Sequence, residues 1–274
     1  MKKKSYVKSL FFLVIGSLIV IGGSFRGYHY FHNSQALIRN SKLYLINGIF
    51  QTCPQKEAVS TAQLAEMLQL SLNLPTHLLD FDEKEAKKRL LNFPIFKTVE
   101  VSKKKPSHIF IDYTIRTPLM IVKDYHDALI DEEGVVFPYK PFFSEKLLPK
   151  CYIGLGQDQL GNEKKKLAIE VLKISQKYLK SLGFQIHLID VSQAFLDSYS
   201  KKEIVLTINQ SYQGVNFDYY LRLASIDLDK QFSNFLVLSK ELQKQQKLWI
   251  KLNGQKPPKG KVIDLRLDGM ALID

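Results

Sequence analysis

The sequence predicts an α+β protein with an N-terminal transmembrane helix, a small β-α-α-β-β module and a larger mixed or antiparallel β domain with flanking helices. Three observations lead to this fold class. An uncharged apolar run occupies residues 10–25. Two amphipathic helical patterns lie between alternating segments in residues 40–117. Short alternating segments separated by turn residues recur through residues 118–274.

The apolar run is preceded by four lysines and no acidic residue. As a helix its sixteen residues span about 24 Å, and the aromatic residues that follow suit the membrane interface, so a crossing helix is predicted over residues 9–31. Because lysines mark the cytoplasmic side of a membrane segment, residues 1–8 are predicted to be a cytoplasmic tail. The rest of the chain is then periplasmic or extracytoplasmic, as in a single-pass type II protein of the inner membrane.

A cleavable secretory signal is the alternative interpretation of the same run. Gly22, Gly23 and Ser24 are small, but Phe25 and Arg26 follow them directly and make a poor cleavage site. A retained anchor is therefore favoured. Both interpretations place the C-terminal part outside the cytoplasm.

Composition narrows the possible partners. The formal net charge is +12. Since an exported protein rarely meets nucleic acid, this charge favours contact with anionic lipid or cell-wall polymer, or a solvated surface, and we expect no nucleic-acid partner. Cys53 and Cys151 form neither a disulfide framework nor a metal-binding knuckle, and we expect both to be unpaired.

The first module begins with alternation and continues with two capped helices. Ser60 with Gln63, and Asp82 with Glu85, have the spacing of helix N-terminal capping boxes, and Pro94 ends the second helix. Apolar residues then alternate with polar ones in the last strand. Strands are predicted at residues 42–49, 98–103 and 108–116, and helices at 60–68 and 82–93.

The second domain begins after Pro118. Its long helix ends where Gly183 provides a natural stop, and a later amphipathic helix carries Phe232 and Leu242. The segment around Trp249 has no assignment. Strands are predicted at residues 119–122, 128–130, 135–137, 184–189, 203–208 and 217–223, a helix at 162–182, and a closing strand or hairpin at 261–273.

Nothing in the sequence has the pattern of a catalytic or cofactor site. It contains no G-x-S-x-G, no H-E-x-x-H and no G-x-x-x-x-G-K-[ST]. His29 and His32 lie one helical turn apart without a third ligand, and interfacial aromatic positions explain them better. Acidic residues in 80–85 suit a helix N-terminus, and the acidic turn 131–134 is more typical of a hairpin than of a calcium site. We expect no enzyme activity, cofactor or metal site.

Four local patterns occur in the order found in one known family. They are FDEKEAKKRLLNFP at 81–94, VEVSKKKPSHIFIDYTIRTP at 99–118, LIDEEGVVF at 129–137 and KVIDLRLDGMALI at 261–273. With the cationic tail and anchor, these patterns resemble the FtsQ/DivIB family of bacterial cell division proteins. The resemblance covers both ends of the exported region, and between residues 153 and 255 it extends only to the order of strands and helices. The family's usual aromatic after I-D-x-R is replaced here by Leu267.

The resemblance implies a POTRA-like domain at residues 40–117 that recruits the chain to the division septum, and a C-terminal β domain at 118–274 that binds other divisome proteins. The implied partners are FtsB/FtsL-like single-pass proteins and also FtsK-, FtsW- and FtsI-like proteins. An extended partner segment would add as a strand to an exposed edge. The edge we predict consists of Val262, Ile263, Asp264, Leu265, Arg266, Leu267, Asp268 and Gly269.

There are two alternatives to this interpretation of the function. POTRA folds also occur in envelope chaperones and substrate-binding modules, although those proteins usually carry several POTRA repeats before a membrane barrel. An envelope hydrolase with an unrecognised site is the third class, and no sequence feature supports it.

Overall fold

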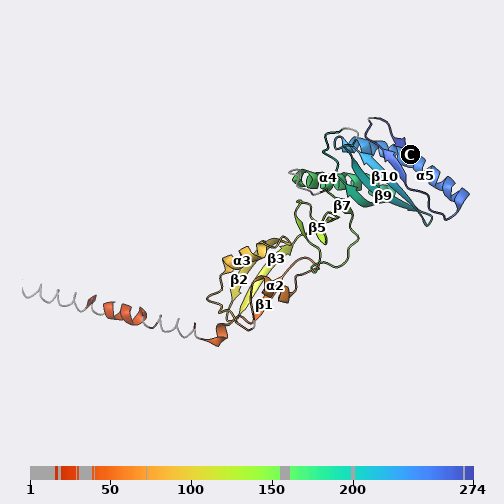
Figure 1. Ribbon diagram of the computed structural model, residues 1–274. Coiled ribbons are helices and arrows are strands. Elements are labelled where there is room, and N and C mark those ends of the chain that lie inside the picture. Colours follow the sequence, from red (N-terminus) through yellow and green to blue (C-terminus); the bar gives the residue numbers. More distant parts are fainter. Residues whose placement is uncertain are drawn as a thin grey trace, which may run out of the picture. The chain divides into compact units, whose positions relative to one another are not determined.

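The computed structural model divides the chain into two compact units, residues 1–114 and 115–274 (Figure 1). Each unit has its own sheet and its own helices. The structure describes residues 16–17, 20–28, 30, 39, 41–71, 73–154, 161–198, 201–267 and 269–274.

The predicted cytoplasmic tail and much of the predicted membrane helix lie outside the described residues. Within 9–31, residues 16–17, 20–28 and 30 are described, and they are helical. Among all described residues, no helix combines the length and the apolar character that crossing a membrane requires.

The first unit has the predicted order β-α-α-β-β. Its three strands form a sheet in the order β1-β3-β2, in which β1 runs parallel to β3. The elements are η1 (Lys42–Tyr44), β1 (Gly48–Thr52), α2 (Thr61–Met67), α3 (Glu83–Leu91), β2 (Phe96–Lys104) and β3 (His108–Ile115).

The predicted first strand is displaced. Residues 42–44 form a short 3₁₀ helix because the Ser41 side chain caps it by accepting a hydrogen bond from the Leu43 N–H at 3.3 Å. The next residues pair elsewhere, since Leu45 bridges His77 and the Ile46 N–H donates to the Thr76 carbonyl at 2.9 Å. Leu45 and Ile46, inside the predicted strand, therefore pair with the loop before α3, and the strand itself begins only at Gly48.

The helix caps of this unit follow the prediction in part. Ser60 and Gln63 form a complete capping box at the start of α2. Asp82 caps α3 by accepting from the N–H groups of Lys84 and Glu85, which lowers the pKa of Asp82. Contrary to the prediction, the Glu85 side chain does not complete a second capping box. It pairs with Arg89, one turn further along the helix, at 3.3 Å.

The core of the first unit is the apolar face of β3. Ile109, Ile111 and Tyr113 are buried on it, with Leu64 of α2 and Leu90 of α3 also buried in this unit. Tyr113 holds the segment between β1 and α2 against β3. Its hydroxyl donates to Gln51 Oε1 at 2.8 Å and accepts from the Val59 N–H at 2.9 Å. Burial raises the pKa of Tyr113 to about 12, so this hydroxyl stays protonated.

The second unit is built on one nine-stranded mixed sheet. Its order is β12-β11-β10-β9-β8-β7-β4-β5-β6. The short strands predicted at 119–122, 128–130 and 135–137, and the longer ones that follow, are confirmed, whereas a strand at 150–152, directly after Pro149, was not predicted. The strands are β4 (Met120–Val122), β5 (Ala128–Ile130), β6 (Val136–Pro138), β7 (Lys150–Tyr152), β8 (Phe184–Asp190), β9 (Ile204–Tyr212), β10 (Val215–Leu223), β11 (Lys261–Asp264) and β12 (Leu272–Ile273).

Two helices, α4 (Gly161–Leu179, continued by η2, Lys180–Leu182) and α5 (Leu228–Asn253), pack beside this sheet (Figure 1). The Tyr178 and Phe232 rings stack between the helices with centroids 5.9 Å apart. Phe235 of α5 meets Phe184 of β8 at 5.5 Å. Alternate residues of β9 and β10 are buried in the same core, whereas the intervening side chains point away from it.

The long helix ends as predicted, with Gly183 in the left-handed conformation at φ 76°. The unassigned segment around Trp249 is the last part of α5, which is longer than its apolar pattern suggested. Both cysteines are free thiols, as expected. Burial, with the nearby Asp124 charge, raises the pKa of Cys151 to about 12, while Cys53 is half-buried and donates to Gln55 Oε1 at 3.1 Å.

Removing the Phe232 ring should destabilise the second unit. Phe232→Ala is expected to lower its free energy of unfolding by about 3–5 kcal/mol, because the side chain is 0% exposed and its loss leaves a cavity under Tyr178. The matched control is Val237→Ala on the same helix, where the side chain is 75% exposed and a change of about 0.5 kcal/mol or less is expected. Urea unfolding of the full chain, followed by the fluorescence of Trp249, its single tryptophan, measures both. Equal shifts in the two variants would contradict this account of the core.

Candidate partner-binding site

The predicted partner-binding stretch lies near one end of the nine-stranded sheet. Val262, Ile263 and Asp264 belong to β11, and Leu265, Arg266 and Leu267 follow it directly. Gly269 has φ 69° in the turn toward β12, and Asp268 lies outside the described residues.

Strand β11 is internal, which corrects the prediction that it forms the edge. It runs parallel to β10, with Leu221 opposite Ile263, and antiparallel to β12, with Ile273 opposite Ile263. The edge of the described sheet is therefore β12. The physical reason is the closing hairpin: the turn containing Gly269 folds the last residues back onto β11, and the Asp274 N–H donates to the Val262 carbonyl at 3.0 Å.

The two faces of the stretch have different roles. Ile263 and Leu265 are fully buried in the core. Asp264 and Arg266, two residues apart, share the opposite face, as the period of an extended chain requires. The Arg266 side chain donates to both carboxylate oxygens of Asp264, with Nη2 to Oδ2 at 2.7 Å and Nε to Oδ1 at 3.0 Å.

Two further residues complete a network of charges on that face. Arg222 of β10 contacts Asp264 Oδ2 through Nη1 at 3.3 Å and also donates to Glu203, just before β9. Arg266 reaches the same Glu203 carboxylate at 3.6 Å. Two arginines and two carboxylates thus connect β9, β10 and the end of β11 across the sheet.

The charge network shifts the pKa of Asp264. Burial alone would raise the pKa of its carboxyl, but the hydrogen bonds from Arg266 and the charges of Arg266 and Arg222 outweigh it, so the pKa is lowered. Asp264 therefore stays ionised at neutral pH and fixes the conformation of the chain as it leaves the sheet.

Apolar side chains remain exposed around this end of the sheet. Leu272 and Ile273 of β12 are 58% and 41% exposed, and Leu267 and Met270 in the connecting turn are exposed as well. Beside them lies a pocket of about 340 Å³. It is lined by Lys202, Ala224, Ser225, Ile226, Asp227, Lys230, Gln231, Asn234, Leu265, Arg266 and Leu267.

Sequence reasoning missed Glu203 and Arg222. Arg222 could have been found as the polar residue that alternates with buried neighbours in β10. Its partners could not, because β11 is placed beside β10 only after the chain has passed through the whole of α5.

The acidic groups considered for catalysis or metal binding have structural roles here. Asp131 begins the turn between β5 and β6 and accepts from the N–H groups of Glu133 and Val135. Arg116 donates to Asp131 at 2.6 Å and to Glu133 at 2.7 Å, so a cation occupies the position that calcium would need. The described residues contain no group of three potential metal ligands. His29 and His32 lie outside them.

Neutralising Asp264 should weaken folding in a pH-dependent way. A lowered folded-state pKa gives stability that is present above the unfolded value of 3.8 and is lost as the pH falls through the folded value. Asp264→Asn is therefore expected to cost about 1–2 kcal/mol at pH 7, with the deficit shrinking below pH of about 4. Chemical unfolding across pH measures it, with Asp197→Asn, an exposed carboxyl without an ion pair among the described residues, as control. A deficit that is independent of pH would contradict the charge network.

Comparison with known proteins adds no family to this description. No protein-family model matches the chain, and no curated protein matches it either. A function for this chain must therefore be inferred from its own residues and their arrangement.

Proposed function

We propose that this chain is an FtsQ/DivIB-like scaffold of the bacterial cell division machinery. It is held in the inner membrane by a single N-terminal helix, and its POTRA-like and C-terminal β domains lie in the periplasm or its equivalent. It acts through protein–protein contacts. Its partners are FtsB/FtsL-like single-pass proteins, with FtsK-, FtsW- and FtsI-like proteins as further partners, and nucleic acid is not among them.

The observation that carries the proposal is the end of the nine-stranded sheet. Its last strand, β12, has only two residues, and both are exposed. Two residues cover little of an edge, and the N–H and C=O groups of an edge pair readily with an extended segment from another chain. The exposed apolar side chains at this end supply contacts for the alternating side chains of such a segment.

Two further features support the scaffold. The β-α-α-β-β order of the first unit agrees with the module that the family resemblance implies. In the N-terminal segment the described helical residues Val20, Ile21 and Phe25 are exposed and apolar, which suits contact with lipid.

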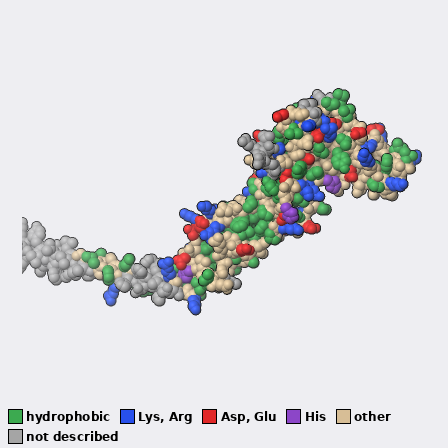
Figure 2. Space-filling model, in the orientation of Figure 1, with side chains coloured by type: hydrophobic (Ala, Val, Ile, Leu, Met, Phe, Trp, Pro, Cys, Tyr) green, Lys and Arg blue, Asp and Glu red, His purple; other side chains and the backbone are tan. Residues whose placement is uncertain are grey.

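The surface charge also fits a protein-binding role better than a nucleic-acid one. Basic and acidic side chains are interspersed over the visible face of each unit (Figure 2). Nucleic-acid recognition instead favours a continuous basic patch that follows the phosphate backbone.

A crosslinking scan in living cells tests the proposal. A photo-crosslinking residue is placed in turn at each position of 262–267 and at Leu272 and Ile273, and the crosslinked proteins are identified by mass spectrometry. An added strand should give products at alternate positions, because successive side chains point to opposite faces. The expected partner is another single-pass division protein.

The positions that respond distinguish two modes of binding. Products from Leu272 or Ile273 alone place the partner outside β12, whereas alternating products within 262–267 place it on β11 after β12 has left. Val237, exposed on α5, is the control position and should give no such product. Crosslinks confined to the chain itself would overturn strand addition here. Unfolded envelope proteins as the only products would favour a POTRA-type chaperone or substrate-binding module instead.

A further inference from the structure

A second unpaired strand edge lies inside the sheet, far from β12 in the strand order. Strand β7 pairs with β8 only through Lys150, Cys151 and Tyr152, which lie opposite Leu188, Ile189 and Asp190. In the first half of β8, residues 184–186 pair with β9 on one side, and His187 lies at a bulge between Ile186 and Leu188. On its other side no strand among the described residues pairs with it.

The chain before β7 turns away rather than continuing beside β8. Pro149 has no N–H to offer a neighbouring strand, and the Leu148 N–H donates back to the Lys146 carbonyl at 3.0 Å. The Leu147 side chain is fully exposed. The sheet therefore splits at this point, and the free edge of β8 borders a groove of about 1310 Å³.

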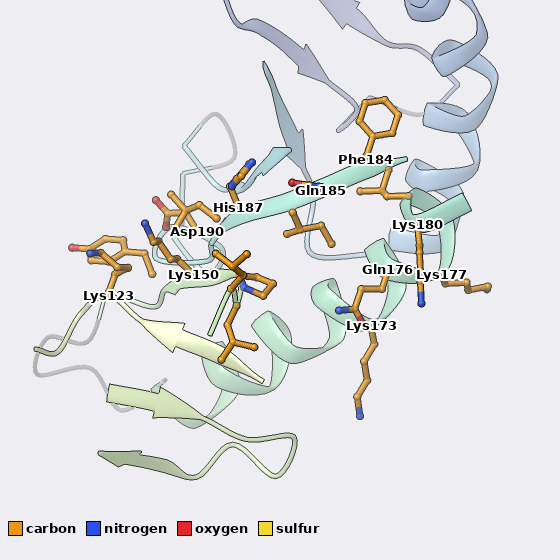
Figure 3. A pocket seen from close by; sticks show the side chains of 17 residues that line it. Lys123, Lys150, Lys173, Gln176, Lys177, Lys180, Phe184, Gln185, His187 and Asp190 are labelled. Atoms are coloured by element: carbon orange, nitrogen blue, oxygen red, sulfur yellow. The ribbon is translucent and has the colours of Figure 1, made fainter. Parts of the chain in front are cut away.

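The walls of this groove come from α4 with its 3₁₀ extension, from β8, and from residues 147–152 with Lys123 (Figure 3). Lys173, Gln176, Lys177 and Lys180 project from α4 and its 3₁₀ extension. Gln185 and His187 belong to β8 and are exposed. The other end is formed by Lys123, Lys150 and Asp190.

The groove carries an excess of positive charge. Five lysines line it against the single carboxylate of Asp190. Lys177 is paired with Asp229 at 2.8 Å, and Lys173 lies 4.0 Å from Glu132. Lys123, Lys150 and Lys180 have no ion pair among the described residues and are exposed. These three cations, at both ends of the free edge, are available to an anionic ligand.

We propose that this groove binds an extended acidic segment of a partner protein, which adds to residues 184–187 as a strand. The main chain of β8 supplies hydrogen bonds, the half-buried Ile186 supplies an apolar contact, and the lysines select acidic side chains. The site is separate from the β12 edge and does not depend on it. A flat lipid surface would reach the rim lysines but not the edge of the strand between them.

Binding of a defined peptide to the full-length chain tests this site. The probe is a fluorescein-labelled peptide of alternating Glu and Thr, about eight residues long, enough to cover the free edge at about 3.3 Å per residue. Fluorescence anisotropy gives its affinity. Amide hydrogen exchange reports whether residues 184–187 become protected. We expect binding together with protection of the amides in this segment that point to the free edge, because alternate N–H groups already face β9.

Matched variants separate the groove from general charge. Lys150→Glu with Lys180→Glu should weaken binding about tenfold or more, because two attractive contacts become repulsive. Lys240→Glu with Lys251→Glu changes the net charge equally on exposed positions of α5 and should leave binding unchanged. The unfolding midpoint, followed by Trp249 fluorescence, checks that both double variants fold.

Two further probes distinguish an added peptide strand from an anionic membrane surface as the ligand of the groove. The same peptide with alternate backbone amides methylated keeps its charge but cannot add as a strand, and it should bind at least about tenfold more weakly. Equal binding of both peptides, absence of protection at 184–187, or failure of the first peptide to bind would overturn the proposal. Phosphatidylglycerol vesicles that bind in a Lys150- and Lys180-dependent way, when the peptide does not, would identify an anionic membrane surface instead.

Discussion

The second unit depends on the burial of one face of its sheet beneath α4 and α5. Every second residue of β9 and β10 enters this core, and the aromatic contacts of Phe232 and Phe235 fix the helices against it. Helices α4 and α5 cover one face of the sheet. Its unpaired backbone N–H and C=O groups therefore lie along the edge strands and where β7 separates from β8. Both candidate binding surfaces are accordingly edges of strands, and neither is a cavity built for a small molecule.

The end of the sheet is stabilised from both faces of β11. Ile263 and Leu265 anchor the strand in the core, while Asp264 and Arg266 join Arg222 and Glu203 outside it. The I-D-x-R pattern thus combines apolar burial and charge pairing within four residues. A segment that pairs with β11 in place of β12 would meet a strand whose position is already fixed, so it would lose little free energy to ordering the site.

Sequence reasoning succeeded where local signals decide the structure. The alternation of residues 108–115 and the helix that ends before Gly183 depend on near neighbours, and both were predicted. It failed where distant segments compete for the same backbone. The two-residue strand β12 is too short to leave a periodic pattern, so β11 was taken for the edge. The groove beside β8 arises where β7 separates from it. The lysines at 173, 177 and 180 have the spacing of one helix face, and nothing in that spacing indicates that they lie beside a strand edge.

The two cysteines differ in a way that bears on how the protein can be studied. Cys151 is buried, and its pKa of about 12 keeps the thiol protonated and unreactive at neutral pH. Cys53, in the other unit, is half-buried, donates to Gln55 Oε1 at 3.1 Å and also interacts with the Tyr113 hydroxyl. A maleimide reagent applied to the folded chain should therefore attach selectively to the first unit. The native sequence thereby contains a single labelling site in the first unit, and its accessibility from outside the cell tests the proposed periplasmic or extracytoplasmic location of that unit.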